Sequence, residues 1–155
     1  MGDKFIAKII HVISGLNVGG AELMLKRLVI ESGKSSSLQQ SIISLTKGGK
    51  VADELISQGF DVIHLDMRSV FSVPKAIYKL VKIFRNNRPN AVYTWMYHAD
   101  LIGGTAAFVS GVKNIIWGIR NSKIPQRSFS VTSAIIRICS VLYFYIPYNF
   151  NIFFA

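Results

Sequence analysis

Residues 8–25 have the sequence KIIHVISGLNVGGAELML, in which an apolar run gives way to a glycine-containing loop and then to an amphipathic segment. The run 8–13 predicts a buried β-strand, because isoleucine and valine dominate it. After the loop, leucine and valine side chains recur at helical spacing among charged residues, which predicts a helix over residues 20–32. A strand, a glycine loop and a helix in this order form the first part of a βαβ unit.

The same alternation continues along the chain. Strands that alternate with helices require crossover connections, which are right-handed and build a parallel sheet covered on both faces. The near-continuous apolar character of the strands agrees with burial on both faces. We therefore predict an open α/β fold of the Rossmann-like kind. The further predicted strands are 41–45, 60–65, 91–95 and 114–118, and the further predicted helices are 50–58, 74–88 and 99–110.

The composition describes one domain with a strongly basic surface. The chain has 155 residues, half of them apolar, and carries a formal net charge of +10. This charge favours acidic partners such as phosphates, nucleotides, anionic lipid head groups or nucleic acid, although it is also that of an ordinary soluble basic protein. The single cysteine, Cys139, cannot form a disulfide within the chain, which fits a reducing compartment. No signal peptide or membrane-spanning stretch is expected.

Ligands of open parallel sheets bind beyond the carboxyl ends of the strands, so the first loop is a candidate site. In this loop Gly19 and Gly20 precede a helix N-terminus, where backbone N–H groups attract phosphate. The spacing G-x-x-x-G-G differs from the dinucleotide fingerprint, and no Gly-Lys-Ser/Thr follows, which disfavours an NAD site and a Walker A loop. The alternative is that the two glycines only permit a tight turn.

Polar side chains follow the fourth and fifth predicted strands. His98 lies just past residues 91–95 and could transfer a proton or bind a ligand, while Asp100 could cap the following helix. Arg120 follows the fifth strand and suits phosphate or carboxylate, although it could be an ordinary solvent-facing arginine. His11 and His64 lie within or near strands and are expected to be structural. No metal site is expected from these scattered histidines.

Three segments together resemble glycosyltransferase family 4, in particular its bacterial capsule and lipopolysaccharide members. They are residues 8–25, VYTWMYHADLIGG at 92–104 and IIWGIRNS at 115–122. The resemblance implies the N-terminal half of a GT-B fold, whose two Rossmann-like domains face a cleft. It also implies a retaining transfer of a sugar from a nucleotide-sugar to a glycan or lipid-linked acceptor, in cell-surface polysaccharide synthesis at the cytoplasmic side of the membrane.

The resemblance also implies roles for particular residues. His98 would be the catalytic residue beside the reacting sugar. Gly19 and Gly20 would line the cleft near the donor phosphates, and Arg120 and Asn121 would border the cleft as substrate-binding residues. No cofactor and no nucleic-acid partner are implied. The lysines of residues 74–88 share one helix face and suggest an anionic membrane surface as a further partner, although a solvated helix face has the same pattern.

The chain departs from the family pattern after about residue 140. The family's C-terminal domain binds the nucleotide-sugar and carries a Glu-x7-Glu motif, whereas Glu22, Glu31 and Glu54 are the only glutamates here and no two are eight positions apart. We therefore expect residues 1–140 to form the Rossmann-like domain and residues 141–155 to be an aberrant aromatic tail, from a frameshift or premature stop, or else a membrane-touching tail. The donor-binding domain is expected to be absent.

These expectations leave more than one function open. A glycosyltransferase half without its donor-binding domain is expected to be inactive alone. The alternatives are a stand-alone phosphate- or nucleotide-binding module, and a non-catalytic subunit of a split glycosyltransferase that contacts a membrane or a partner chain. The two motif segments between residues 92 and 122 favour the first reading.

Overall fold

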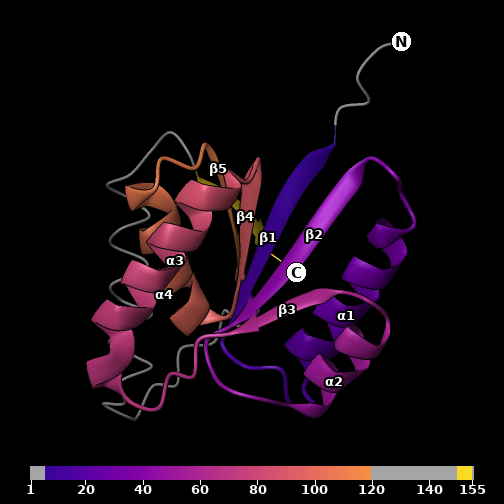
Figure 1. The fold of residues 1–155 in the computed structure, drawn as a ribbon, viewed down its shortest axis with the longest axis horizontal. Helices are drawn as coiled ribbons and strands as arrows, with labels where there is room; N and C mark the ends of the chain where they lie inside the picture. The colour runs from indigo at the N-terminus through magenta and orange to yellow at the C-terminus, as the bar shows by residue number, and fades with distance from the viewer. Residues whose placement is uncertain (1–5, 120–149, 155) are drawn as a thin grey trace.

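The computed structural model describes residues 6–119 and 150–154, which form a parallel sheet between two layers of helices (Figure 1). The strand order is β3-β2-β1-β4-β5-β6, and every neighbouring pair is parallel. The predicted open parallel α/β fold is confirmed. The strands are β1 (Ala7–Ile13), β2 (Leu38–Ser44), β3 (Asp61–His64), β4 (Ala91–Trp95), β5 (Asn114–Ile119) and β6 (Phe150–Phe154), and the helices are α1 (Gly20–Gly33), α2 (Lys50–Ser57), the short 3₁₀ helix η1 (Val70–Ser72), α3 (Val73–Asn87) and α4 (Tyr97–Val109).

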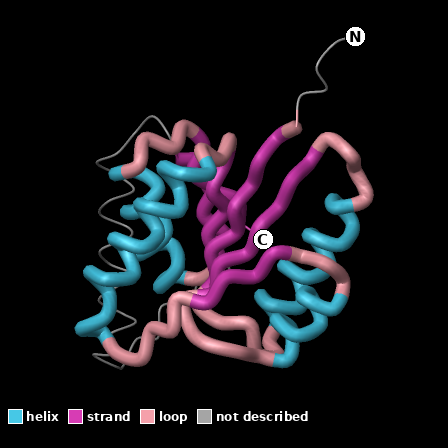
Figure 2. Tube along the Cα trace, in the orientation of Figure 1, coloured by secondary structure: helices cyan, strands magenta, loops and turns pink. Residues whose placement is uncertain are grey.

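The helices divide between the two faces of the sheet. Figure 1 shows α1 and α2 on one face and α3 and α4 on the other, and Figure 2 shows the twisted strands between these layers. Successive residues of a strand therefore enter opposite cores. Val12 and Ile43 pack on the α3–α4 side, while Ile13 and Ile42 pack on the α1–α2 side. Burial on both faces explains why the strands are almost continuously apolar.

Strand β2 begins three residues earlier than the sequence predicts, because polar Gln40 lies within it. The Gln40 side chain accepts hydrogen bonds from His11 Nε2 (3.2 Å) and Ser32 Oγ (3.1 Å) and donates to the Val29 carbonyl (3.3 Å). These bonds satisfy a polar side chain that would otherwise disfavour the position. The apolar pattern alone could not show that these partners exist.

Helix α4 lies against the sheet at two glycines. A Cβ at Gly103 would come within 3.0 Å of side-chain atoms of Val12 and Thr94, and one at Gly104 within 2.8 Å of the Trp117 indole nitrogen. The small residues of this helix therefore permit a helix–sheet distance that larger side chains would prevent.

Only residues 150–154 of the expected C-terminal tail, residues 141–155, are described by the structure. Residues 150–154 form strand β6 beside β5, which the sequence did not predict, and the rest of the segment 141–155 lies outside the described residues. Cys139 also lies outside them. Among the helices that are described, none is long and apolar enough to cross a bilayer.

Candidate functional site

A cavity of about 490 Å³ opens at the carboxyl edge of the sheet. It lies between the loops that follow β1, β2 and β3, the start of α3 and the first turns of α4, which is where an open parallel sheet binds its ligands. Its polar rim comprises Ser14, Thr46, Arg68, Ser69 and His98. The other lining residues are apolar: Leu45, Met67, Val70, Val73, Leu101 and Ile102.

His98 lines this cavity. It is the second residue of α4 and its side chain is exposed. Met96 alone connects the end of β4 to the start of α4, and its φ is positive, at +73°. A positive φ is uncommon for any residue other than glycine, and here it lets the chain pass from strand to helix within one residue. The turn therefore brings His98 to the edge of the sheet, as its place in the sequence predicted, while its catalytic role stays a prediction.

Gly19 and Gly20 lie at the start of α1 and are not among the residues that line the cavity. A side chain at Gly20 would meet nothing within 4 Å, so the fold does not require glycine there. Beside Gly19 the carboxylate of Glu22 occupies the space that a Cβ would take. A phosphate at this helix N-terminus would have to displace that carboxylate, because both anions favour the same N–H groups.

The remaining predicted site residues, Arg120 and Asn121, lie outside the described residues. The cavity instead adds residues that the sequence did not single out, notably Thr46 and Arg68. Thr46 Oγ1 donates to the Ser14 carbonyl (3.1 Å), which joins the loops after β1 and β2. The signal for these residues was only positional: they follow the second and third strands, but no motif marks them.

Arg68 projects at the rim of the cavity and is paired with Asp66. The guanidinium donates to both carboxylate oxygens, with Nη2 to Oδ2 at 2.9 Å. The Arg68 hydrogen bond, together with the nearby charges of Arg68, Lys47 and Lys79, lowers the pKa of Asp66. Arg68 is the direct partner of this carboxylate, and Lys47 and Lys79 act on it through their charges.

Gly49, which the sequence did not single out, packs against the backbone of the loop that follows β1. Gly49, the residue before α2, has φ +123°, and a Cβ there would overlap the Leu16 carbonyl and lie 2.8 Å from the Asn17 nitrogen. Two residues further on, the Val51 N–H donates to the same Leu16 carbonyl (3.0 Å). The loop after β1 thus rests directly on the backbone at the start of α2.

Asp100 does not cap α4, which corrects one reading of the sequence. Met96 is the N-cap, and Asp100 lies inside the helix, 1% exposed, where it accepts a hydrogen bond from Thr94 Oγ1 at 2.6 Å. Its other oxygen has no hydrogen-bond partner. Burial raises the pKa of Asp100 to about 7, against the lowering effect of the Thr94 hydrogen bond. The helix begins at Tyr97, two residues before the predicted start, and this turns Asp100 toward the sheet.

His11 has the structural role expected of it. It is 2% exposed, donates from Nε2 to Gln40 and accepts at Nδ1 from the Trp95 indole N–H (3.3 Å). Burial lowers the pKa of His11 to about 4. His64 is half-buried beside the Thr46 carbonyl. In the described part of the chain, no three His, Cys, Asp or Glu residues are grouped to hold a metal ion.

The two buried groups should give opposite pH dependences of stability. Asp100, with a raised pKa, destabilises the fold as pH rises from about 4 to 7, because only the unfolded carboxyl ionises freely there. His11, with a lowered pKa, destabilises the fold as pH falls from about 6.5 to 4, because only the unfolded imidazole is protonated there. We therefore expect Asp100→Asn to raise the free energy of unfolding at pH 8 by roughly 2–4 kcal/mol and to change it little at pH 4.

Urea denaturation of both proteins across pH 4–8 tests this expectation. The wild-type curve should be shallow, because the two effects oppose each other, and the Asp100→Asn curve should rise with pH between about 4 and 6.5 as the His11 effect alone remains. Lower stability of Asp100→Asn than of wild type at pH 8 would contradict the assignment.

The fold and the cavity define a Rossmann-like domain with a cavity at the carboxyl edge of its parallel sheet. No family model matches the chain. The chain is 26% identical over 147 residues to CapH of Staphylococcus aureus, a capsular polysaccharide biosynthesis glycosyltransferase, and the match covers 90% of this chain and 40% of CapH. The chain thus spans less than half the length of this relative.

Solved structures show the same fold. HepE of Anabaena, in complex with UDP and glucose, matches with a TM-score of 0.66 at 16% identity, over 88% of this chain and 35% of HepE. MurG of Acinetobacter baumannii matches with a TM-score of 0.59 at 18% identity, over 85% of this chain and 39% of MurG. With CapH, these similarities confirm the resemblance to the N-terminal half of a GT-B glycosyltransferase.

Proposed function

We propose that this chain supplies the acceptor-side half of a glycosyltransferase in cell-surface polysaccharide synthesis. The similar solved structures show only the fold, and a fold does not determine a reaction. The sequence similarity to CapH, which covers 90% of this chain, is what supports sugar transfer. The observation that carries the proposal is the cavity at the carboxyl edge of the sheet, with His98 on its rim. A ligand in this cavity lies where a second domain could present a donor across a cleft.

The transfer joins the anomeric carbon of the donor sugar to an acceptor oxygen and releases a nucleoside diphosphate. His98 would hydrogen-bond the reacting sugar and stabilise charge that develops at the anomeric centre. The backbone at Gly19 and Gly20 would approach the donor phosphates, and Arg120 and Asn121 would border the cleft. Because HepE binds UDP and glucose, a UDP-sugar is the donor class that we propose, with retention at the anomeric carbon.

A chimera tests the proposal, with this chain in place of the matching part of CapH. We expect the chimera to consume a UDP-sugar in the presence of membrane-derived acceptor, and the chain alone to consume none, since donor and acceptor must be held in register. A chimera that is folded by circular dichroism and consumes no nucleotide-sugar would instead favour a non-catalytic binding module.

We also infer that the chain works at the cytoplasmic face of an anionic membrane through α3. Lys75, Lys79 and Lys82 are all exposed on this helix. Each cation close to an anionic surface adds about 1 kcal/mol of binding, which salt screens. We expect sedimentation with phosphatidylglycerol vesicles at low salt, weaker sedimentation when the three lysines are glutamine, and none with phosphatidylcholine. Equal sedimentation with both lipids would show that the lysines are only a solvated face.

A further inference from the structure

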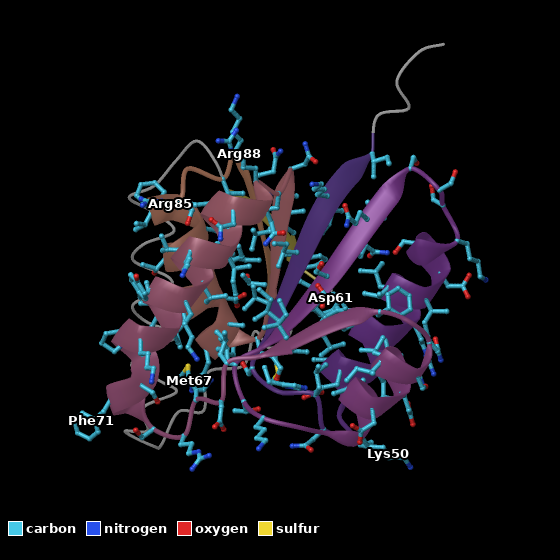
Figure 3. All side chains as sticks on the ribbon, in the orientation of Figure 1. Lys50, Asp61, Met67, Phe71, Arg85 and Arg88 are labelled. Atoms are coloured by element: carbon cyan, nitrogen blue, oxygen red, sulfur yellow. The ribbon has the colours of Figure 1, made fainter. Side chains whose placement is uncertain are left out.

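The tip formed by residues 69–72, at the mouth of the cavity, exposes an aromatic side chain that the fold does not use. Phe71 is 96% exposed and Val70 is 67% exposed. Figure 3 shows Phe71 pointing away from the molecule at one end of α3, with Arg85 and Arg88 at the other end. Ser72 holds the tip in shape, because its hydroxyl accepts from the Ser69 N–H (3.2 Å) and donates to the Ser69 carbonyl (2.5 Å). An ordered tip that presents phenylalanine to solvent is typical of a contact surface.

The tip and the cavity share one apolar surface. Val70 is exposed on the tip and also lines the cavity, so apolar surface continues from Phe71 into the interior. Inside, Met67 and Leu101 are half-buried and pack against the core, and Ile102 is 3% exposed. A volume of about 490 Å³ is within the range of small-molecule sites. Apolar walls of this kind suit a hydrocarbon chain better than a sugar, whose hydroxyl groups need hydrogen-bond partners.

Basic residues lie at and beside the mouth of the cavity, where Arg68 is a lining residue and Lys47 follows the lining residue Thr46. The charges of Lys47, Arg68 and Lys79 all lower the pKa of Asp66, the carboxylate that accepts two hydrogen bonds from Arg68. Between residues 67 and 119 the sequence has only one other acidic residue, Asp100, and that side chain is buried against the sheet. A phosphate at the mouth would therefore meet cations at the same point where the apolar surface begins.

We propose that this cavity binds the hydrocarbon chain of a phosphate-bearing lipid, with the phosphate at Arg68 and with Phe71 in the membrane interface. The inference rests on the proposed function and narrows it: the acceptor is carried on a lipid phosphate, and part of its lipid enters the protein. Asp66 holds the Arg68 guanidinium through two hydrogen bonds. The phosphate is held next to the rim on which His98 lies.

Binding of n-decyl phosphate to the chain tests the proposal, followed by the NMR signal of the Met67 methyl group below the micelle-forming concentration. We expect decyl phosphate to bind at least tenfold more tightly than decyl maltoside, which lacks the charge. Inorganic phosphate, which lacks the chain, should leave the Met67 signal unmoved. Equal affinity for the two decyl compounds, or a Met67 response to inorganic phosphate alone, would overturn the proposal.

Variants separate the parts of the site. Leu101→Trp fills the cavity and should weaken decyl phosphate binding at least tenfold. Val70→Ser changes an exposed lining residue and should leave the fold intact, so it tests the site even if Leu101→Trp fails to fold. We expect it to weaken decyl phosphate binding several-fold. Arg68→Gln should reduce the preference for decyl phosphate over decyl maltoside, whereas Lys113→Gln, an exposed charge change at the opposite edge of the sheet, should not. Unchanged binding in Val70→Ser would overturn the proposal.

Vesicle binding tests the role of the tip formed by residues 69–72. Phe71→Ser should weaken binding to phosphatidylglycerol vesicles about tenfold, while Ile56→Ser, which alters an exposed apolar residue on α2, should not. If Phe71→Ser lowers the Tm of the CapH chimera and leaves vesicle binding unchanged, the tip is a contact between domains and the proposal is overturned.

The binding assays need no sugar transfer, so the two proposals fail separately. A chimera that consumes donor while the chain does not bind decyl phosphate would overturn the lipid site and keep the transferase. Decyl phosphate binding with the expected variant effects, in a chain whose folded chimera consumes no donor, would support the lipid site and overturn the transferase.

Discussion

Replacing Gly49 with alanine is expected to abolish stable folding. The residue has φ +123°, where an L side chain is strained, and its Cβ would overlap the Leu16 carbonyl. The new Cβ would meet backbone atoms of Leu16, whose carbonyl is held by the Val51 N–H at 3.0 Å, so neither segment can move away without losing this contact. We expect a loss of at least about 4 kcal/mol, which approaches the whole stability of an average domain. Thermal unfolding followed by circular dichroism should show a Tm lower by more than about 10 °C, or no cooperative transition.

Two matched glycine variants serve as controls. Gly48→Ala has φ +67° but open space around the new methyl group, so it should cost only the roughly 1–2 kcal/mol of a left-handed alanine. Gly20→Ala meets nothing within 4 Å and should be close to neutral. A Tm of Gly49→Ala equal to that of Gly48→Ala would show that the loop after β1 adjusts easily.

Replacing His98 with alanine is expected to lower kcat of the CapH chimera about 100-fold. The imidazole lies on the rim of the cavity and is exposed, so it is free to contact a bound sugar. Loss of a positioned group that acts mainly in the transition state reduces kcat more than it raises KM. Steady-state kinetics with the UDP-sugar as variable substrate measures both parameters.

The folding of the His98 variant must be compared at the same time. Because the His98 side chain is exposed, the Tm of the His98→Ala protein should stay within a few degrees of the wild-type Tm. His64→Ala changes a histidine that does not line the cavity, and it should keep kcat within a few-fold while affecting stability alone. A folded His98→Ala chimera with most of its kcat would show that the histidine is not catalytic.

The fold was largely predictable because hydrophobic periodicity is local. Each of the five predicted strands and four predicted helices corresponds to an observed element, and the boundaries differ mainly where polar residues enter them. Gln40 lies inside β2 because His11, Ser32 and Val29 supply its partners from other elements. Such partners depend on the tertiary structure and leave no periodic signal in the sequence.

The site was predictable only in part, since steric demands and burial arise between distant segments. The sequence directed attention to Gly19 and Gly20, whereas Gly49 has the stricter requirement, which depends on contact with Leu16. Asp100 resembled a helix cap until the true start of α4 placed it inside the helix. His98 was correctly placed at the carboxyl edge, but the apolar cavity beside it comes from residues with no motif.

The order of the strands has a consequence for folding kinetics. Strand β1 pairs with β2 on one side and with β4 on the other, and the second pairing joins Ile9 to Ala91. During synthesis, β1, β2 and β3 can assemble while one edge of β1 remains unpaired until β4 has left the ribosome. Contacts this distant in sequence slow folding, and an open apolar edge invites pairing with other chains. Slow addition of β4 should therefore limit refolding, and aggregation should compete with it as protein concentration rises.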